Sequence, residues 1–350
     1  MKKNLKKIPV LIKGVYENGL SKITKKPAKL YGLFFEVTDA CNSRCRHCNV
    51  WRQKPTENHL TLPEIENIFK NPFFRNLREV IISGGEPLLR EDLEEIILKI
   101  HKYIRPDALI SLSTNGLMPK RAIKVAQTFL KKRINIVFGV SLDGIGEKHD
   151  KIRGVKGNFE KVDFLLHELM KLKTNYKEKL KVIVGFTLSP LTVNLMEEVK
   201  TYVERLEFDF LPQVYEKASF YFNEENHLKN TINNDMVREI QKLPSSFQKE
   251  VLLKAARNVR IKFRCSSMNT FFVLHCNGDV SPCLRYSHIR LGNLREQSID
   301  EIWQSKAVKE ARMMIKNCSG CYNTWGVGWS LKAWFFPFLK LILKTTLKRK

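Results

Sequence analysis

The sequence predicts an α/β protein with a parallel sheet, built as an open, partial (β/α)6 barrel and followed by a small cysteine-rich C-terminal domain. Three observations carry this prediction. Apolar runs typical of strands alternate with helical patterns over the first two thirds of the chain, and such alternation implies a parallel sheet. Six strand–helix units are too few for a closed eight-unit barrel. Beyond residue 260 the pattern changes to short apolar runs, turns and cysteines.

The strands and helices follow one another in a regular order. Apolar runs predict strands over 33–38, 79–83, 109–113, 135–141, 181–187 and 207–212. Helical patterns predict helices over 61–70, 92–104, 119–132, 157–175, 191–206 and 234–257, and one near 298–316 in the C-terminal domain. Loops that follow parallel strands meet at one edge of the sheet, so the residues just after these strands are expected to form the active face.

The chain is strongly basic, and its positive charge gathers at the two ends. It has 61 Lys and Arg against 36 Asp and Glu, a net charge of +25. Residues 1–30 contain nine lysines and one acid, and residues 331–350 contain six basic residues and no acid. Such an excess attracts nucleic acid or an anionic lipid surface, although solvated lysine-rich tails have the same composition. The hydrophobic content of 43% excludes a disordered or fibrous chain.

The C-terminal end is apolar as well as basic. Residues 329–343 combine Trp, Phe and Leu with Lys332 and Lys340, and Pro337 interrupts them. The stretch is too short to cross a bilayer, which needs about 20 apolar residues, but it suits an interfacial helix. A helix docked on the protein's own core is the equal alternative. Because the N-terminus lacks the apolar region of a signal peptide, we expect a cytoplasmic protein, with peripheral attachment to the inner face of an anionic membrane as an alternative.

Three cysteines lie close together after the first predicted strand. Cys41, Cys45 and Cys48 are separated by three and by two residues. Thiolates at this spacing can converge on one iron–sulfur cube, and three ligands leave one iron open to another molecule. Eight cysteines in a cytoplasmic chain favour metal ligation over disulfides. A zinc site would need a fourth ligand, and His47 is poorly placed for that because it adjoins Cys48.

The Cys41-x3-Cys45-x2-Cys48 loop resembles the signature of the radical S-adenosylmethionine (SAM) superfamily. Later segments, each just after a predicted strand, resemble the family's cofactor-binding motifs in the family's order: Gly84, Gly85, Glu86 and Pro87; Ser113 and Asn115; Ser141, Asp143 and Arg153; and Thr187 with Asn194. The resemblance implies a TIM-like partial barrel, a [4Fe–4S] cluster and bound SAM. It also implies a one-electron reductant of the flavodoxin or ferredoxin type, reductive cleavage of SAM to a 5′-deoxyadenosyl radical, and hydrogen abstraction from a substrate.

The resemblance also implies roles for individual residues. The backbone carbonyls of Gly84 and Gly85, together with Glu86, would accept hydrogen bonds from the methionyl ammonium, because paired glycines permit a close approach. Ser141 and Arg153 would hold the methionyl carboxylate, which suits a guanidinium fork. His47 stands where the family often has an aromatic residue against adenine, and its planar ring would stack there.

The C-terminal cysteines resemble those of the SPASM and twitch domains, which hold auxiliary iron–sulfur clusters. Asn277-Gly278 is a strong hairpin-turn dipeptide, and it leads into Pro282-Cys283 as in those domains. By motif position the ligands of an auxiliary [4Fe–4S] cluster would be Cys265, Cys283, Cys318 and Cys321. No cysteine follows Cys321, which favours the twitch-like form with a single auxiliary cluster. Structural zinc is the alternative for four thiolates.

Four segments follow from these observations: a basic extension over 1–29, a radical SAM core over 30–259, an auxiliary-cluster domain over 260–325 and a basic amphipathic tail over 326–350. Cys276 is interpreted as a non-ligand and as a hypothetical radical-quenching residue; no other residue is marked as catalytic. The substrate is not identified. Peptide or protein modification is the commonest role in the resembled group, and a lipid or lipid-linked glycan is the alternative. Nucleic-acid binding is disfavoured because no recognised binding module is found.

Overall fold

One continuous nine-stranded sheet organises the computed structural model, which describes residues 30–176, 178–216, 218–222, 234–244, 246–257, 259, 264–318 and 322–333. The strands are β1 (Gly32–Thr38), β2 (Glu79–Gly84), β3 (Leu109–Thr114), β4 (Asn135–Ser141), β5 (Leu180–Leu188), β6 (Asp209–Val214), β7 (Phe271–Leu274), β8 (Asp279–Ser281) and β9 (Gly292–Asn293). Their order across the sheet is β6-β5-β4-β3-β2-β1-β7-β8-β9. The first six strands are parallel, so the predicted partial barrel is confirmed.

The cysteine-rich C-terminal part extends this sheet. Strand β7 pairs parallel to β1, with Gly32 opposite Phe271, and β8 and β9 follow antiparallel. Because β1 has a partner on each side, all seven of its residues are buried. The loop that carries the first cysteines therefore leaves the sheet beside the C-terminal hairpin.

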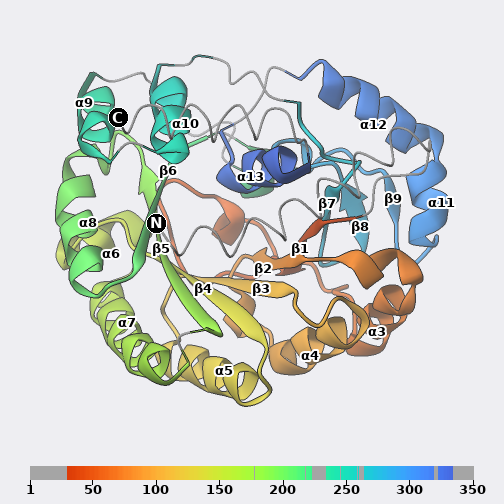
Figure 1. Cartoon of the computed structure of the whole chain (residues 1–350), viewed down its shortest axis with the longest axis horizontal. Helices are drawn as coiled ribbons and strands as arrows, with labels where there is room; N and C mark the ends of the chain where they lie inside the picture. Colours follow the sequence, from red (N-terminus) through yellow and green to blue (C-terminus); the bar gives the residue numbers. More distant parts are fainter. Residues whose placement is uncertain are drawn as a thin grey trace.

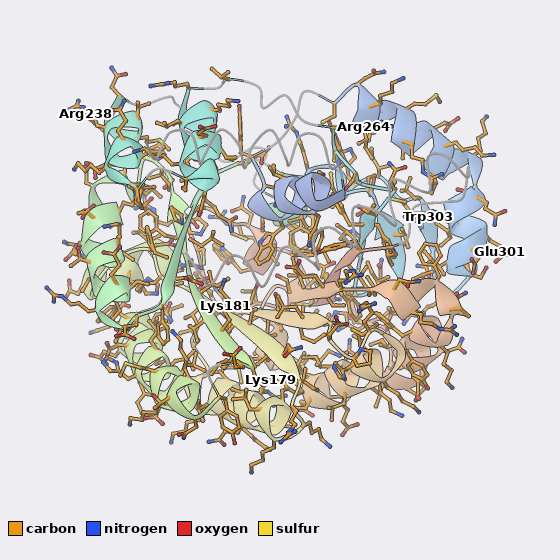
Figure 2. All side chains as sticks on the ribbon, viewed as in Figure 1. Lys179, Lys181, Arg238, Arg264, Glu301 and Trp303 are labelled. Carbon is orange, nitrogen blue, oxygen red and sulfur yellow. The ribbon has the colours of Figure 1, made fainter. Side chains whose placement is uncertain are left out.

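Helices cover the outer face of the sheet and form the rim of the molecule (Figure 1). In chain order they include α3 (Leu62–Lys70), α4 (Leu93–Tyr103), α5 (Pro119–Lys131), α7 (Asn158–Asn175) and α8 (Met196–Arg205). A capping box starts α3, in which Thr61 and Glu64 satisfy each other's backbone N–H groups. Charged side chains such as Arg238 and Glu301 point outward, whereas Trp303 turns inward against Phe272 (Figure 2).

Two predicted helices are wrong in extent, since each is split. The helix expected over 234–257 is α9 (Asn234–Lys242) and α10 (Phe247–Ala256), because Pro244 between them has no N–H to continue a helix. The helix expected over 298–316 is α11 (Ile299–Gln304) and α12 (Lys306–Lys316). At Ser305 the backbone is extended, with φ −60° and ψ 159°, and the Ser305 hydroxyl accepts a hydrogen bond from the Val308 N–H.

Two further boundaries differ from the prediction, and one helix is added. Helix α8, expected from residue 191, begins at Met196, because a 3-10 turn over Val193–Leu195 precedes it. Strand β6 begins at Asp209, two residues later than expected, because the preceding Glu207 takes a left-handed turn at φ 54°. The segment after β4 forms a short helix, α6 (Glu147–Arg153), that the apolar pattern does not reveal.

The last described element, α13 (Thr324–Ala333), lies inside the curve of the sheet (Figure 1). Trp329 is buried there, its ring centroid is 5.2 Å from that of Phe271, and its Nε1–H donates to the Glu79 carboxylate at 2.8 Å. The beginning of the predicted tail is thus docked on the core. Residues 1–29 and 334–350, on which the membrane and lipid hypotheses depend, lie outside the described residues. No helix in the described ranges has the length and apolarity to cross a bilayer.

Candidate functional site

Two sets of cysteines line one cavity of about 1340 Å³. Cys41, Cys45 and Cys48 lie at the carboxyl ends of the parallel strands, and Cys265, Cys283 and Cys318 come from the C-terminal part. Residues from the ends of β2 to β6 complete the walls, among them the predicted Gly84, Gly85, Ser113, Asn115, Ser141 and Thr187. The fold therefore gathers six of the seven predicted cluster ligands around one space, the seventh, Cys321, being outside the described residues.

The first cysteine loop is held by the end of helix α6. The backbone N–H groups of Arg44 and Arg46 donate to the carbonyls of Arg153 and Ile152 at 2.9 and 3.0 Å. Gly154 ends the helix in the left-handed conformation at φ 71°, and a Cβ there would lie 2.4 Å from the Arg44 carbonyl oxygen. Only glycine permits this approach, so the motif after β4 fixes the position of the loop after β1.

The paired glycines after β2 hold the same loop from the other side. A Cβ on Gly84 would lie 2.0 Å from the Thr38 carbonyl oxygen, and one on Gly85 would lie 2.1 Å from that of Ala40. The Gly85 N–H donates to Thr38 and the Glu86 N–H to Ala40, both at 2.8 Å. The close approach expected of these glycines is thus made to the backbone of the cysteine loop. Both residues also line the cavity.

Glu86 is fully buried and does not border the cavity. Its carboxylate accepts hydrogen bonds from the Asn115 N–H at 2.7 Å and the Leu88 N–H at 3.2 Å, which ties the end of β2 to the end of β3. Burial raises the pKa of Glu86 to about 7. Pro87 is buried beside it. Contact of Glu86 with the methionyl ammonium stays a prediction; in this structure its partners are the two backbone N–H groups and the Thr114 hydroxyl.

A buried histidine and an asparagine continue this network, and neither was assigned a role from the sequence. His149 Nδ1 accepts the Asp143 N–H at 3.1 Å, so the proton sits on Nε2, which donates to Asn158 Oδ1 at 3.0 Å. Asn158 in turn donates to the Asn115 carbonyl at 3.2 Å. Burial lowers the pKa of His149 to about 4 and keeps the ring neutral. The signal in the sequence was the His149-Asp150 pair that follows the Asp143-Gly144 turn.

Arg153 lies between the cavity and a buried acid. Its Nη2 is 2.7 Å from Asp143 Oδ2, and its Nη1 donates to the Cys45 sulfur at 3.7 Å. Asp143 Oδ1 accepts the Thr187 N–H at 2.7 Å, so the acid faces away from the cavity. Although burial opposes both charges, their mutual attraction raises the pKa of Arg153 and lowers that of Asp143. Within the described part of the chain, Arg153 Nε has no hydrogen-bond partner, which leaves a donor for a bound anion.

His47 borders the cavity beside the cysteines. Its Nε2 lies 3.8 Å from Asp143 Oδ2, and burial lowers the pKa of His47 to about 4. The ring is therefore neutral, and its stacking on adenine stays a prediction. Ser111 also lines the cavity, and its buried hydroxyl finds no partner among the described residues. Polar groups thus remain for a ligand along the strand ends.

The spacing of the thiols fits a cluster better than a single ion. Among the described residues, neither cysteine set brings three sulfurs within 4.8 Å of one another, the arrangement that one ion would need. A cube of four irons spreads its cysteine ligands more widely. Burial raises the pKa of Cys41 to about 11 and that of Cys48 to about 12. Without a metal these thiols would stay protonated, and iron would bind them as thiolates.

The second cysteine set closes the other end of the cavity. Cys265 Sγ accepts the Ser267 N–H at 3.5 Å, and Tyr286 Oη lies 3.7 Å from Cys318 Sγ. Burial raises the pKa of Cys283 to about 12. The fourth predicted ligand, Cys321, lies outside the described residues. Cys276 does not line the cavity.

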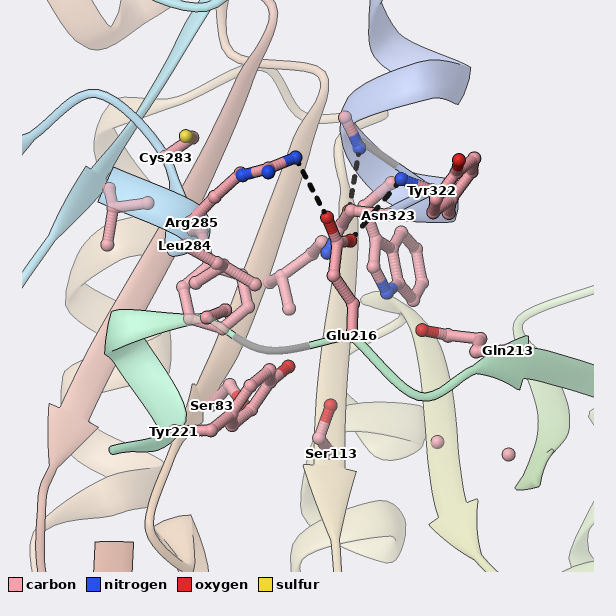
Figure 3. A pocket seen from close by; sticks show the side chains of 18 of the residues that line it. Ser83, Ser113, Gln213, Glu216, Tyr221, Cys283, Leu284, Arg285, Tyr322 and Asn323 are labelled. Carbon is pink, nitrogen blue, oxygen red and sulfur yellow. Dashed lines mark hydrogen bonds and ion pairs between the residues drawn. The ribbon is translucent and has the colours of Figure 1, made fainter. Parts of the chain in front are cut away.

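An ion pair on the cavity wall was not predicted from the sequence. Arg285 Nη1 lies 3.3 Å from Glu216 Oε1, and the Tyr322 N–H donates to the other oxygen of Glu216 at 3.3 Å (Figure 3). Burial raises the pKa of Glu216. The Tyr221 ring lies below this pair on the cavity wall (Figure 3). The only signal was position, since Glu216 follows the sixth strand and Arg285 follows Cys283 by two residues.

Comparison with known families identifies two regions of the chain. The model of the radical SAM superfamily matches residues 35–203. The SPASM model, described as an iron–sulfur cluster-binding domain, matches residues 265–322. These ranges contain every predicted cluster ligand and cofactor-binding residue.

Curated relatives carry several names. A probable GTP 3′,8-cyclase of Methanococcus aeolicus is 30% identical over 274 residues, which cover 73% of this chain and 86% of the relative. A GTP 3′,8-cyclase of a Sulfurovum species is 40% identical over 113 residues, 31% of this chain and 33% of the relative. An Fe-coproporphyrin III synthase of Methanosarcina barkeri is 31% identical over 50% of this chain and 42% of its own. Apart from the Methanococcus protein, the match spans less than half the length of these relatives.

Solved structures share the fold at low sequence identity. Streptococcus suis SuiB bound to the precursor peptide SuiA superposes with a TM-score of 0.64 and 16% identity, over 86% of this chain and 74% of SuiB. The native anSMEcpe with bound AdoMet and Cp18Cys peptide gives a TM-score of 0.58 and 17% identity, over 90% of this chain and 99% of that one. The matches to both family models and to the Methanococcus relative show that the chain belongs to the radical SAM superfamily and carries a C-terminal SPASM domain, which makes it an enzyme with a [4Fe–4S] cluster, SAM and auxiliary iron–sulfur.

Proposed function

We propose that this enzyme modifies a peptide or protein by hydrogen abstraction, with the reacting residue held between the two cysteine sets. The observation that carries the proposal is the single cavity that both sets line. When bound, the first cluster and SAM supply a 5′-deoxyadenosyl radical. The chain's own contribution is to orient SAM, through the spare Arg153 Nε and the strand-end hydroxyls, and to exclude water from the space between.

The size of the cavity supports a large substrate. Sites for single small ligands commonly measure about 300–1,000 Å³, and this cavity measures about 1340 Å³. SAM and the two clusters would share this space with the substrate, which favours a short segment of extended chain over a whole folded domain. The two structural neighbours, SuiB and anSMEcpe, have a precursor peptide and a Cp18Cys peptide bound.

The charge of the cavity wall supports an acidic segment. Among the described residues, four basic side chains border the cavity on the C-terminal side: Arg264, Arg285, Arg312 and Lys316. Glu216 is the acid among them, and its charge is matched by Arg285. The net positive wall would attract carboxylates, and guanidinium groups suit their geometry. We therefore expect an acidic residue near the modified position of the substrate.

The test is to purify the anaerobic holoenzyme from its host and to identify bound molecules by mass spectrometry. A captured acidic peptide that stimulates 5′-deoxyadenosine release supports the proposal. Arg285→Ala should raise KM for that peptide by about tenfold, while peptide-independent SAM cleavage persists. Arg238→Ala, an exposed change on α9, is the matched control. A captured nucleotide would contradict the peptide assignment, and equal KM values for the two variants would contradict the role of the basic wall.

A nucleoside triphosphate is the second candidate substrate. It is favoured by the Methanococcus relative, which is named a probable GTP 3′,8-cyclase and is matched over 86% of its length. The same basic wall suits phosphate oxygens. Holoenzyme supplied with GTP alone decides between the candidates. Transfer of deuterium from labelled GTP into 5′-deoxyadenosine would establish the nucleotide and would exclude the peptide.

We further propose a single auxiliary cluster held by Cys265, Cys283, Cys318 and Cys321, with electrons supplied by a flavodoxin- or ferredoxin-type protein. Two cubes correspond to about eight iron atoms per chain. Changing Cys41, Cys45 and Cys48 to alanine should leave about four irons and abolish SAM cleavage. Iron near twelve in the wild type would contradict the single auxiliary cluster. Retained cleavage in the triple variant would contradict the role of the first cysteine set.

A further inference from the structure

Three side chains with metal-binding atoms converge outside the cavity. Asp39 follows β1, His59 precedes α3, and Cys276 lies in the turn between β7 and β8. One ligand atom from each, an oxygen, a nitrogen and a sulfur, lies within 4.8 Å of the other two. Asp39 Oδ1 and His59 Nε2 are 2.8 Å apart. None of the three residues lines the cavity, so the group is separate from both cysteine sets.

Hydrogen bonds hold the segments that carry these three side chains in place without an ion. The Thr56 N–H donates to Asp39 Oδ2 at 2.9 Å, which leaves Oδ1 turned toward His59. The Leu60 N–H donates to the Cys276 carbonyl at 2.6 Å, so the residue after His59 is bound directly to the turn that carries the thiol. The three side chains are thus held by backbone bonds between separate segments.

Arg295 forms a second layer behind the group. Its guanidinium donates to the backbone carbonyls of His59 at 2.9 Å and Asn277 at 3.1 Å. His59 is one of the three residues of the group, and Asn277 directly follows another, Cys276. The Glu64 carboxylate holds the guanidinium in place at 2.7 Å. Outer groups that orient the inner ligands are characteristic of built metal sites.

The charges and the exposure of the group also favour a cation. Cys276 is buried with 3% exposure, while the His59 and Asp39 side chains keep 27% and 22%. One side of the group is therefore closed and the other is open to water. Burial, together with the nearby carboxylates of Glu36 and Asp39, raises the pKa of Cys276, so the thiol stays neutral until a bound cation displaces its proton. One oxygen, one nitrogen and one sulfur form a donor set that suits zinc-class ions, and three protein ligands leave a fourth position for water.

We propose that Asp39, His59 and Cys276 bind one zinc-class divalent ion, with water as the fourth ligand. The ion would join the turn between β7 and β8 to the segment two residues before Cys41. It would thereby fix the cluster loop of the barrel against the C-terminal hairpin. The site uses a cysteine that neither cluster needs, and it does not depend on the identity of the substrate.

The test uses the anaerobic holoenzyme with its clusters reconstituted, incubated with zinc and then freed of excess ion. About one zinc per chain is expected in addition to the cluster iron, and X-ray absorption at the zinc edge should report about one sulfur and three nitrogen or oxygen ligands. A zinc ion lodged in a cluster site would instead show three or four sulfurs. That outcome, or no retained zinc, would overturn the proposal.

Two variants test whether these side chains bind the zinc ion. Cys276→Ser and His59→Gln should each lose the zinc while both keep their cluster iron, which shows that they fold. His59→Gln retains a donor toward Asp39, so a purely hydrogen-bonded cluster would tolerate it. The matched control is His167→Gln, a change on α7 where the imidazole bonds its own helix. Arg295→Lys should weaken zinc binding by about 10–100-fold through the second layer. Zinc retained in Cys276→Ser and His59→Gln would overturn the assignment.

Discussion

At the residue scale, two glycines decide how closely β2 approaches the first cysteine loop. The Cβ positions of Gly84 and Gly85 fall 2.0 and 2.1 Å from carbonyl oxygens of that loop. A clash with backbone atoms cannot be relieved by a side-chain rotation. The loop itself would have to move, and the cysteines it carries would move with it.

We therefore expect Gly85→Ala to disturb the first cluster more than the fold. The overpacked site should cost about 1–3 kcal/mol of unfolding free energy, and about half of the iron should be lost as the first cluster fails to assemble. Iron content and thermal unfolding measure the two effects. Gly328→Ala in α13 is the control, because a Cβ there meets nothing within 4 Å. Full iron content in Gly85→Ala would contradict this reading of the motif.

The neutral His149 gives the protein a predictable dependence on pH. Its pKa is lowered to about 4 from an ordinary 6.5, because burial disfavours the imidazolium. Between these values the unfolded chain takes up a proton that the native state does not, so stability is complete above pH 6.5 and falls as the pH is lowered toward 4. The full difference corresponds to roughly 3 kcal/mol.

Thermal unfolding of the wild type and of His149→Gln, followed from roughly pH 7 to 5.5, measures this effect. The wild type should lose stability as the pH falls, and the variant, which has no imidazole at this position, should lose less. The variant is expected to be less stable at pH 7, since the Asp143 N–H and Asn158 lose well-placed partners. Parallel pH curves for the two proteins would show that His149 is not the group responsible.

At the element scale, Ser305 ends one helix and starts the next. It is the C-terminal cap of α11 and the N-terminal cap of α12, where its hydroxyl accepts the Val308 N–H at 3.2 Å. Ser305→Ala should lower the unfolding free energy by about 1 kcal/mol because the N–H is left without its cap. Ser305→Asn, which restores an acceptor, should recover most of the loss. Equal stability of Ser305→Ala and the wild type in denaturant titrations would contradict the capping role.

The element boundaries separate what local sequence encodes from what it does not. The parallel strands are predicted to within two residues, because each is a run of apolar residues between turn signals. The breaks at Pro244 and Ser305 are missed because the apolar spacing continues through them. Proline at position 244 indicates a helix end and could have been used to predict that break. Serine at position 305 gives almost no such indication, because serine is common within helices and only its extended backbone reveals the cap.

At the scale of the whole molecule, the barrel and the cysteine-rich part share one sheet. Phe272 on β7 is fully buried between Phe74 and Trp303, so it joins β7 to helices from both parts. We expect Phe272→Ala to destabilise the entire chain by about 3–5 kcal/mol. Hydrogen exchange should then rise in β3 and β4 as well as in β7.

Phe164→Ala provides the control, because Phe164 is an aromatic residue 46% exposed on α7 and should be nearly neutral. If exchange in Phe272→Ala rose only in β7 to β9, the C-terminal hairpin would be an independent unit. The barrel strands and the C-terminal hairpin would then not unfold as one cooperative unit.

Patterns within single segments of the chain predict the alternating architecture, the first cysteine set and the glycine, serine and arginine motifs. These are local properties, set by periodicity and by spacing within one loop. Contacts between distant segments are visible only in the folded chain: β7 pairs with β1, the Glu86 carboxylate accepts the Asn115 N–H, Arg285 meets Glu216, and Asp39, His59 and Cys276 converge. Each of these joins residues far apart in the chain, and no pattern within a segment encodes which distant segment will lie beside it.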